Sequence, residues 1–330
     1  MDNLIESTPK ANLVNQTNHE VELIEIQNQH TKLTVCPNFG GKIISIKSRT
    51  TDTEFLKQPF IDIRKITEPE YGMDFLPPYS FGFDECFPTV EPCSYHLLNG
   101  NKVSIPDHGE VWNRKWDVAK TRNSIEMNIR GIDLDYKLTK KISLHNHLIL
   151  MTYELSNTGS QDFRYLWSTH PLLHIEENDE ILLPKDVHEV EVYYSNNKQL
   201  IKGDKYQWAS NLKHNLVSNI VQGVNSNFAS KVFVKDPHTK KAGLYRRGED
   251  QSIVFDFTYS GIEQLGIWMT YKGWPENSNN KDYTVALEPT TTSMDSLSEA
   301  IEQNDAKYIR AGESIDWSLK VLIENGRSEL

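Results

Sequence analysis

Short runs of residues that alternate between hydrophobic and polar recur along most of the chain, and many are rich in valine, isoleucine and threonine. Alternation with a period of two indicates strands that bury one face. Turn-forming residues separate the runs, such as Gly40 and Gly41 near the start and Asn157-Thr158-Gly159 further on. The predicted strands are residues 21–26, 32–36, 42–48, 124–129, 136–144, 147–156, 231–236, 252–259, 264–271, 283–288 and 317–324.

Helical periodicity is scarce. Residues 293–304 place three apolar side chains on one face, with Ser293 or Asp295 as the expected N-cap. Many short strands with one short helix are typical of a sandwich or a barrel. The sequence therefore predicts an all-β protein.

Nothing in the sequence marks a boundary between two domains, because there is no fixed-period repeat, low-complexity tract or Gly/Ser-rich linker. The first 17 residues are polar and have no periodicity. We therefore expect an N-terminal tail or edge segment at residues 1–17 and a single domain over residues 18–330.

The balance of charge is acidic, with 46 Asp and Glu against 35 Lys and Arg in 330 residues. Binding to a phosphate backbone depends on clustered positive charge, so nucleic acid is not an expected partner. The N-terminal residues lack the basic and apolar pattern of a signal peptide. No window approaches the roughly 20 apolar residues of a membrane helix. We expect a soluble, cytoplasmic protein that does not associate with a membrane.

The three cysteines, Cys36, Cys86 and Cys93, form an odd and sparse set. Such a set is typical of reduced thiols rather than of a disulfide framework, and its spacing fits no common zinc motif. His170 and His174 have H-x-x-x-H spacing, but the proline between them would interrupt a helix and the glutamate of H-E-x-x-H is missing. The sequence therefore predicts no metal site.

Two strand ends carry side chains suited to proton transfer. His170 lies among small or polar residues in WSTHPLLHI, and Glu288 points to the face opposite Val285 and Leu287 in VALEPTT. A carboxylate held at the end of a rigid strand is well placed as a base. Taken alone, each residue is more typical of a structural role, because such histidines are commonly hydrogen-bonded within the fold and Glu-Pro is common in turns.

Residues 105–116 combine an acid, a histidine and two tryptophans. Asp107 and His108 could bind sugar hydroxyls, or they could cap the backbone of their own loop. Trp112 and Trp116 could stack on the apolar face of a pyranose, although tryptophan is as often part of the core. The segment is therefore a candidate sugar-binding loop.

Two more segments are rich in aromatic residues and carry a few charges. GFDECFPTVEPC contains Asp84 and Glu85, either of which could bind sugar hydroxyls, within a stretch rich in proline that suggests a long ordered loop, a common place for binding residues. An aspartate there is also a frequent organiser of turns. IWMTYKGWPE supplies Trp268, Lys272 and Trp274, for which the same two interpretations stay open.

Taken in this order, the segments resemble the aldose 1-epimerase family. The resemblance rests on NFGGKIISI, DHGEVW, SNTGSQDFRYLWSTHP, GIWMTYKGWP and ALEPTT, within residues 20–324. Its most specific element is an Asn-Thr-Gly turn, then His170 on a strand about a dozen residues later, then a distant Leu-Glu-Pro. It implies a galactose-mutarotase-like β-sandwich (supersandwich) of large antiparallel sheets with few short helices, and a monosaccharide bound across a concave face.

The resemblance also implies a function, the interconversion of the α and β anomers of an aldose without a cofactor. The family's acid histidine falls on His170, its base glutamate on Glu288 and its second pocket histidine on His108. Glu288 would remove the anomeric proton while His170 donates to the ring oxygen. We therefore expect these two groups several ångströms apart, on either side of the ring.

The chain departs from the family pattern in places that leave the substrate open. It has no clear counterpart of the Gly-Arg segment of galactose-type enzymes, and it has His108-Gly109-Glu110 in place of His-Gly-Gly. Arg114 lies later than the arginine of sugar-phosphate mutarotases, so a phosphorylated sugar is an alternative substrate. A non-catalytic carbohydrate-binding protein on the same fold is another alternative, and a lyase or hydrolase is a third. The sequence does not decide between a monomer and a homodimer.

Overall fold

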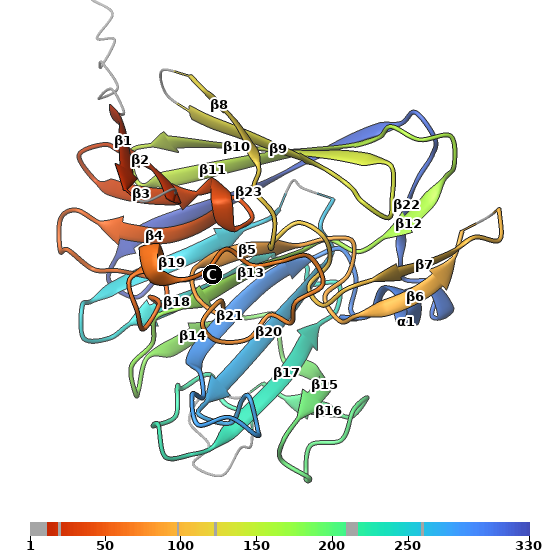
Figure 1. Ribbon diagram of the computed structural model, residues 1–330. Coiled ribbons are helices and arrows are strands. Elements are labelled where there is room, and N and C mark those ends of the chain that lie inside the picture. The colour runs from red at the N-terminus through yellow and green to blue at the C-terminus, as the bar shows by residue number, and fades with distance from the viewer. Residues whose placement is uncertain (1–11, 19–20, 98, 122–123, 209–216, 259–260) are drawn as a thin grey trace, which may run out of the picture.

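Two large antiparallel sheets pack face to face and form the body of the molecule (Figure 1). All eleven predicted strands are present, with ends that differ by three residues at most, so the all-β prediction is confirmed. Residues 1–11 of the expected tail lie outside the described part of the chain. The computed structural model describes residues 12–18, 21–97, 99–121, 124–208, 217–258 and 261–330.

The first sheet has 11 strands, which follow one another in the sheet as β1 (Asn12–Asn18), β2 (Val21–Gln27), β3 (Thr31–Cys36), β4 (Lys42–Ser48), β5 (Phe83–Cys86), β13 (Ser168–Leu173), β21 (Tyr283–Thr290), β20 (Gln264–Tyr271), β17 (Phe228–Val234), β15 (Glu189–Ser195) and β16 (Lys205–Gln207). The second has 8 strands, in the order β14 (Glu180–Leu182), β18 (Lys241–Arg246), β19 (Gln251–Asp256), β23 (Ser314–Asn325), β11 (Leu148–Asn157), β10 (Tyr136–His145), β9 (Ser124–Arg130) and β8 (Asp117–Lys120). β1 and β16 therefore form the two edges of the larger sheet (Figure 1).

Smaller elements surround the sandwich. Two short ribbons pair β6 (Cys93–His96) with β7 (Lys102–Ile105) and β12 (Phe163–Tyr165) with β22 (Lys307–Ile309), and the β6–β7 hairpin projects beside the helix α1 (Leu297–Glu302) (Figure 1). Two 3-10 turns, η1 (Pro37–Phe39) and η2 (Ile63–Lys65), complete the described elements. No helix among them has the length and apolar character needed to span a membrane.

The helix α1 is shorter than the predicted 293–304, and its N-cap is Ser296, whose hydroxyl accepts a hydrogen bond from the backbone N–H of Glu299. The two N-caps expected from the sequence have other partners. The N–H and hydroxyl of Ser293 bind the carboxylate of Asp305, and the carboxylate of Asp295 pairs with a lysine of β17. Because tertiary contacts engage Ser293 and Asp295, the helix begins later than predicted.

Alternation along the strands produces two apolar clusters, one on each face of the larger sheet. On β13, Leu173 belongs to the main core between the sheets, whereas its neighbour Leu172 belongs to a second cluster on the outer face. The segment between β4 and β5 covers this outer cluster with Phe75, Tyr79 and Phe81. This segment therefore covers part of the outer face of the 11-stranded sheet, and a cavity can form beside it.

A buried ion pair links the two sheets across the main core. Lys140 of β10 donates to a carboxylate oxygen of Glu85 of β5 at 2.7 Å and to the carbonyl of Gly41 at 2.9 Å, and the hydroxyl of Tyr153 donates to the other oxygen of Glu85 at 2.9 Å. Lys140 and Glu85 are buried. Each charge is thus neutralised and hydrogen-bonded, as a charge inside a core must be.

Replacing Lys140 with Met is expected to lower the free energy of unfolding by about 3–5 kcal/mol, because it leaves the buried carboxylate of Glu85 without its cation. Urea unfolding followed by circular dichroism measures the change. Lys141→Met is the matched control, since Lys141 is the next residue of the same strand and is exposed. An equal loss in the two variants would contradict a special role of the ion pair.

Candidate functional site

A cavity of about 310 Å³ lies on the outer face of the 11-stranded sheet, beside the covering segment. Aromatic side chains make much of its wall, and its lining includes four carboxylates and one lysine. Its lining residues are Phe75, Ser80, Val90, Glu91, Pro92, Asp107, His108, His170, Leu172, Tyr194, Lys231, Trp268, Trp274, Asp282 and Asp295. A cavity that combines apolar walls with a few convergent polar groups is the usual form of a small-molecule site.

His170 and Glu288 meet at one end of this cavity. Nδ1 of His170 lies 3.0 Å from Oε1 of Glu288, and the exposed fractions of the two residues are 7% and 1%. The expected separation of several ångströms is therefore wrong. β13 and β21 are neighbouring antiparallel strands with Leu172 opposite Ala286. His170, two residues before Leu172, therefore lies beside Glu288, two residues after Ala286.

Lys231 of β17 completes a row of charges next to this pair. Its ammonium binds Oε2 of Glu288 and lies 3.2 Å from the carboxylate of Asp295. β20 lies between β17 and β21, and Gly266 of β20 is paired with Glu288 of β21. A Cβ at position 266 would lie 3.0 Å from Cε of Lys231 and 3.2 Å from Oε2 of Glu288. Glycine therefore leaves the room in which the lysine reaches the glutamate.

Burial and mutual charge shift the pKa values along this row, which consists of His170, Glu288, Lys231 and Asp295. Burial alone would raise the pKa of Glu288, but the charges of Lys231 and His170 outweigh it and lower this pKa to about 2. Burial lowers the pKa of His170, and the charge of Glu288 offsets this only in part. Burial raises the pKa of Asp295 to about 6 despite Lys231. At neutral pH Glu288 is thus ionised and His170 is mainly neutral.

A second histidine and carboxylate face the same end. Nδ1 of His108 lies 3.0 Å from Oδ2 of Asp107, which also accepts the backbone N–H of Phe75 at 2.7 Å. The ring of His108 stacks on Phe75 at 4.4 Å and lies edge-on to His170 at 5.1 Å between centroids. His108 has a φ of 58° and is followed by Gly109. A Cβ added at position 109 would lie 2.0 Å from the carbonyl oxygen of Phe87, so the backbone of this loop is tightly packed.

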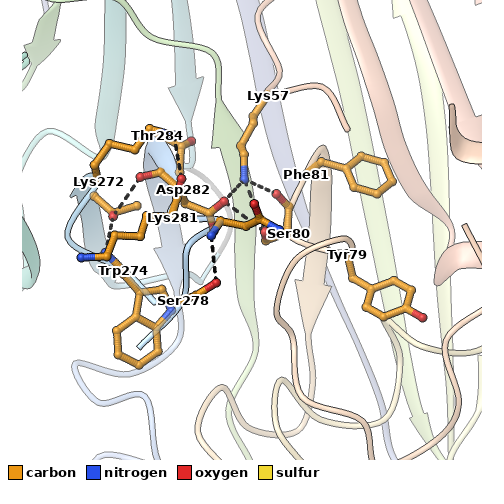
Figure 2. A network of polar contacts seen from close by, with 12 residues as sticks. Lys57, Tyr79, Ser80, Phe81, Lys272, Trp274, Ser278, Lys281, Asp282 and Thr284 are labelled. Carbon is orange, nitrogen blue, oxygen red and sulfur yellow. Dashed lines mark hydrogen bonds and ion pairs between the residues drawn. The ribbon is translucent and has the colours of Figure 1, made fainter. Parts of the chain in front are cut away.

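Three aromatic rings form a corner of the cavity. Trp274 lies 5.7 Å from Tyr194 and 6.1 Å from Trp268, and Tyr194 lies 5.9 Å from Trp268 between ring centroids. Figure 2 shows Trp274 close to Asp282, in a network that continues to Lys57. Rings at a cavity wall with a carboxylate nearby suit a ligand that has apolar faces and hydroxyl edges.

Five of the residues singled out in the sequence, His170, Asp107, His108, Trp268 and Trp274, line the cavity together, whereas Glu288 lies behind it. The other candidates for sugar binding do not line it, so their predicted contact with sugar has no support there: Asp84, Glu85, Trp112, Arg114, Trp116 and Lys272.

Asp84 is fully buried and lies 3.0 Å from the ammonium of Lys42. Trp112 is 1% exposed and donates its indole N–H to the carbonyl of Asp107 at 2.9 Å. Arg114 donates to the carbonyls of Glu110 and Arg130, and Lys272 donates to the carbonyl of Lys281 at 2.7 Å. Their polar groups therefore serve the fold: each side chain has an internal partner that the sequence did not indicate.

Lys231, Asp282 and Asp295 line the cavity but were not predicted as site residues. Lys231 begins a predicted strand, and the other two stand next to a predicted strand and in a predicted helix. Because most lysine side chains are exposed to solvent, a lysine at the start of a strand is expected to be exposed as well. The one available signal was the apolar run Val232-Phe233-Val234 that directly follows it and packs in the core.

Cys86, His108 and His170 place one potential metal ligand each within 4.8 Å of one another. His174, the other member of the H-x-x-x-H pair, lines a separate surface depression with Thr51 and Glu249. Burial raises the pKa of Cys86, which favours the neutral thiol over the thiolate that binds metals. Cys36, Cys86 and Cys93 are free thiols, as the sequence predicted.

Solved structures of similar shape carry mutarotase names, although no known protein-family model matches the chain. A galactose mutarotase-like protein from Clostridium acetobutylicum superposes with a TM-score of 0.72 at 15% identity, over 96% of this chain and 99% of that one. A galactose mutarotase related enzyme from Lactobacillus acidophilus gives 0.66 at 15% identity, over 93% and 99%. A galactose mutarotase-like protein from Lactobacillus casei gives 0.63 at 15% identity, over 92% and 100%. The chain therefore has the galactose mutarotase-like fold.

Proposed function

We propose that this protein is an aldose 1-epimerase, which interconverts the α and β anomers of an aldose by opening and closing the sugar ring. The observation that carries the proposal is the cavity-lining imidazole of His170, held through Nδ1 by the buried carboxylate of Glu288. Since Glu288 is ionised, it accepts the Nδ1 proton and leaves Nε2 of His170 free to exchange a proton with a bound sugar.

The reaction needs two proton movements. The anomeric hydroxyl gives up its proton, the bond from C1 to the ring oxygen breaks, and the ring oxygen gains a proton, which yields the open-chain aldehyde. Rotation about the C1–C2 bond and the reverse steps give the other anomer. His170 is mainly neutral at neutral pH, so it accepts a proton in the first step, and Glu288 stabilises the imidazolium that forms.

The second proton-transfer group has to face the sugar from another side. Glu288 is covered by His170 and Lys231 and does not line the cavity, so it acts through His170. Asp295 does line the cavity and is linked to Glu288 through Lys231. Its pKa of about 6 keeps a useful fraction of the acid protonated near neutral pH. We therefore assign the exchange at the ring oxygen to Asp295.

Exchange between anomers is measured by NMR on a panel of aldoses, with and without the protein. We expect the protein to accelerate exchange of at least one sugar, and His170→Asn to lower that rate by about 10²–10⁴-fold, because the imidazole is the proton carrier. His174→Asn is the matched control, since His174 lies outside the cavity. A wild-type protein that leaves every aldose at its spontaneous rate would contradict the proposal.

One observation favours a second candidate, a non-catalytic carbohydrate-binding protein on the same fold. The carboxylate of Glu288 is 1% exposed and has partners at both oxygens, an arrangement that a purely structural ion pair would also have. Such a protein would bind sugar without accelerating anomer exchange. A sugar-phosphate substrate is disfavoured, because the cavity holds one lysine against four carboxylates and Arg114 lies outside it.

A further inference from the structure

The cavity has a second polar end, far from His170. Asp282 lines the cavity and immediately precedes β21, six residues before Glu288. At about 3.3 Å per residue along a strand, the two backbone positions lie roughly 20 Å apart. One pyranose with its hydroxyls spans less than half of that distance. A single sugar ring at His170 therefore leaves the Asp282 end unfilled.

The carboxylate of Asp282 is held in place from behind. The ammonium of Lys57 binds its Oδ1, and the hydroxyl of Ser80 donates to the same oxygen at 3.2 Å (Figure 2). Lys57 also binds the backbone carbonyl of Ser80, so the cation is fixed between the two residues. Within the described residues, no hydrogen bond engages Oδ2 of Asp282. That oxygen is a preorganised acceptor on a residue that faces the cavity.

The backbone of an aromatic residue, Trp274, is hydrogen-bonded to that of Asp282. The backbone N–H of Asp282 donates to the carbonyl of Trp274 at 2.7 Å, and the N–H of Trp274 donates to the hydroxyl of Thr270 at 3.2 Å. Trp274 and Asp282 both line the cavity. The ring of Trp274 in turn meets Tyr194 and Trp268 in the aromatic corner. Apolar ring faces and a carboxylate thus occur together, as binding of a sugar ring requires.

We infer that the Asp282 end is a second subsite, which binds a further neutral sugar unit joined to the ring at His170. The ligand is then a reducing disaccharide or a longer neutral saccharide, bound with its reducing ring at His170. The ring of Trp274 stacks on the second sugar ring, Trp268, which stands at 86° to Trp274, packs against its edge, and Oδ2 of Asp282 accepts a hydrogen bond from one of its hydroxyls. Acidic or phosphorylated sugars are excluded there, because Asp282 would repel them. The inference rests on the proposed function for the orientation of the ligand.

Isothermal titration calorimetry with maltose, cellobiose and lactose, each compared with D-glucose and D-galactose, tests the subsite. We expect at least one disaccharide to bind on the order of 10- to 100-fold more tightly than its own reducing-end monosaccharide, the range that a hydrogen bond to a charged group provides. Asp282→Asn and Trp274→Ala are each expected to remove most of this preference. Disaccharides that bind no better than monosaccharides would overturn the subsite.

A matched control separates a local effect from a general one. Asp52→Asn removes one carboxylate that pairs with a lysine, Lys47 at 2.8 Å, in an exposed turn outside the cavity, and it should keep the preference. If Asp282→Asn weakens monosaccharides and disaccharides by the same factor, Asp282 does not belong to a separate subsite. Because the assay measures binding, it is independent of turnover. Preference for a disaccharide without anomer exchange would refute the epimerase and keep the subsite, and exchange without the preference would do the reverse.

Discussion

Replacing Glu288 with Gln is expected to lower the rate of anomer exchange by about 10²–10⁴-fold while the protein stays folded and binds sugar. The reason lies in the two partners of the side chain. Lys231 can only donate a hydrogen bond, so the amide turns its oxygen toward Lys231 and its NH₂ toward Nδ1 of His170. His170 must then carry its proton on Nε2, the tautomer that cannot accept a proton from the sugar.

The pH dependence of exchange distinguishes this role of Glu288 from a structural one. Its charge raises the pKa of His170, so removing that charge should move the acid limb of the pH profile to lower pH. Glu288→Asp, which keeps the carboxylate, should restore part of the rate. Glu154→Gln, at an exposed position of β11, is the control. Near-normal exchange by Glu288→Gln would remove Glu288 from the mechanism.

Replacing Lys231 with Met is expected to destabilise the protein by about 3–5 kcal/mol at neutral pH, because two buried carboxylates lose the cation between them. In the wild type, Glu288 stabilises the fold fully above its ordinary pKa of 4.5, and this contribution is lost as pH falls toward about 2. Without Lys231, burial dominates and raises the pKa of both Glu288 and Asp295. Groups with a raised pKa destabilise the fold at high pH, so the deficit should shrink as pH falls from 7 to 5.

Chemical unfolding of the wild type and Lys231→Met at several pH values measures this deficit. Lys235→Met is the matched control, because Lys235 follows the same strand, is partly exposed and pairs with Glu191 at 2.8 Å. Surface substitutions of this kind change stability by roughly 0.5 kcal/mol or less. A deficit that does not vary with pH would argue that the carboxylates of the row do not depend on Lys231 for their charge.

Strand prediction succeeded where one face of a strand is buried and the other is not. β10 and β11 alternate between buried and more exposed residues and were predicted to within one residue at each end. β5 was missed because all four of its residues are buried, including Asp84 and Glu85, so it has no alternation. Its carboxylates have lysine partners from β4 and β10. Because these partners are distant in sequence, a buried strand with charged residues cannot be predicted from its own residues.

The same limit applies to the site. His170 and Glu288 were singled out at two strand ends and paired through the family resemblance, and the structure places them in contact. Their contact distance was wrong, because the pairing of β13 with β21 cannot be read from either segment alone. Lys231 was missed for the same reason: its role comes from a partner two strands away across the sheet. Motifs thus locate candidate side chains, while strand order decides which of them touch.

Gly266 has a consequence for proteins that share this fold. A methyl group there would lie 3.0 Å from Cε of Lys231 and 3.2 Å from Oε2 of Glu288, so alanine at 266 would force the end of the lysine side chain to shift by a few tenths of an ångström. The two positions should therefore change together in an alignment of this chain's relatives. Chains that keep the glycine and the lysine would have their glutamate clamped as it is here. Chains that have lost both would leave the glutamate open to the sugar, and the pair of positions would sort the two kinds by sequence alone.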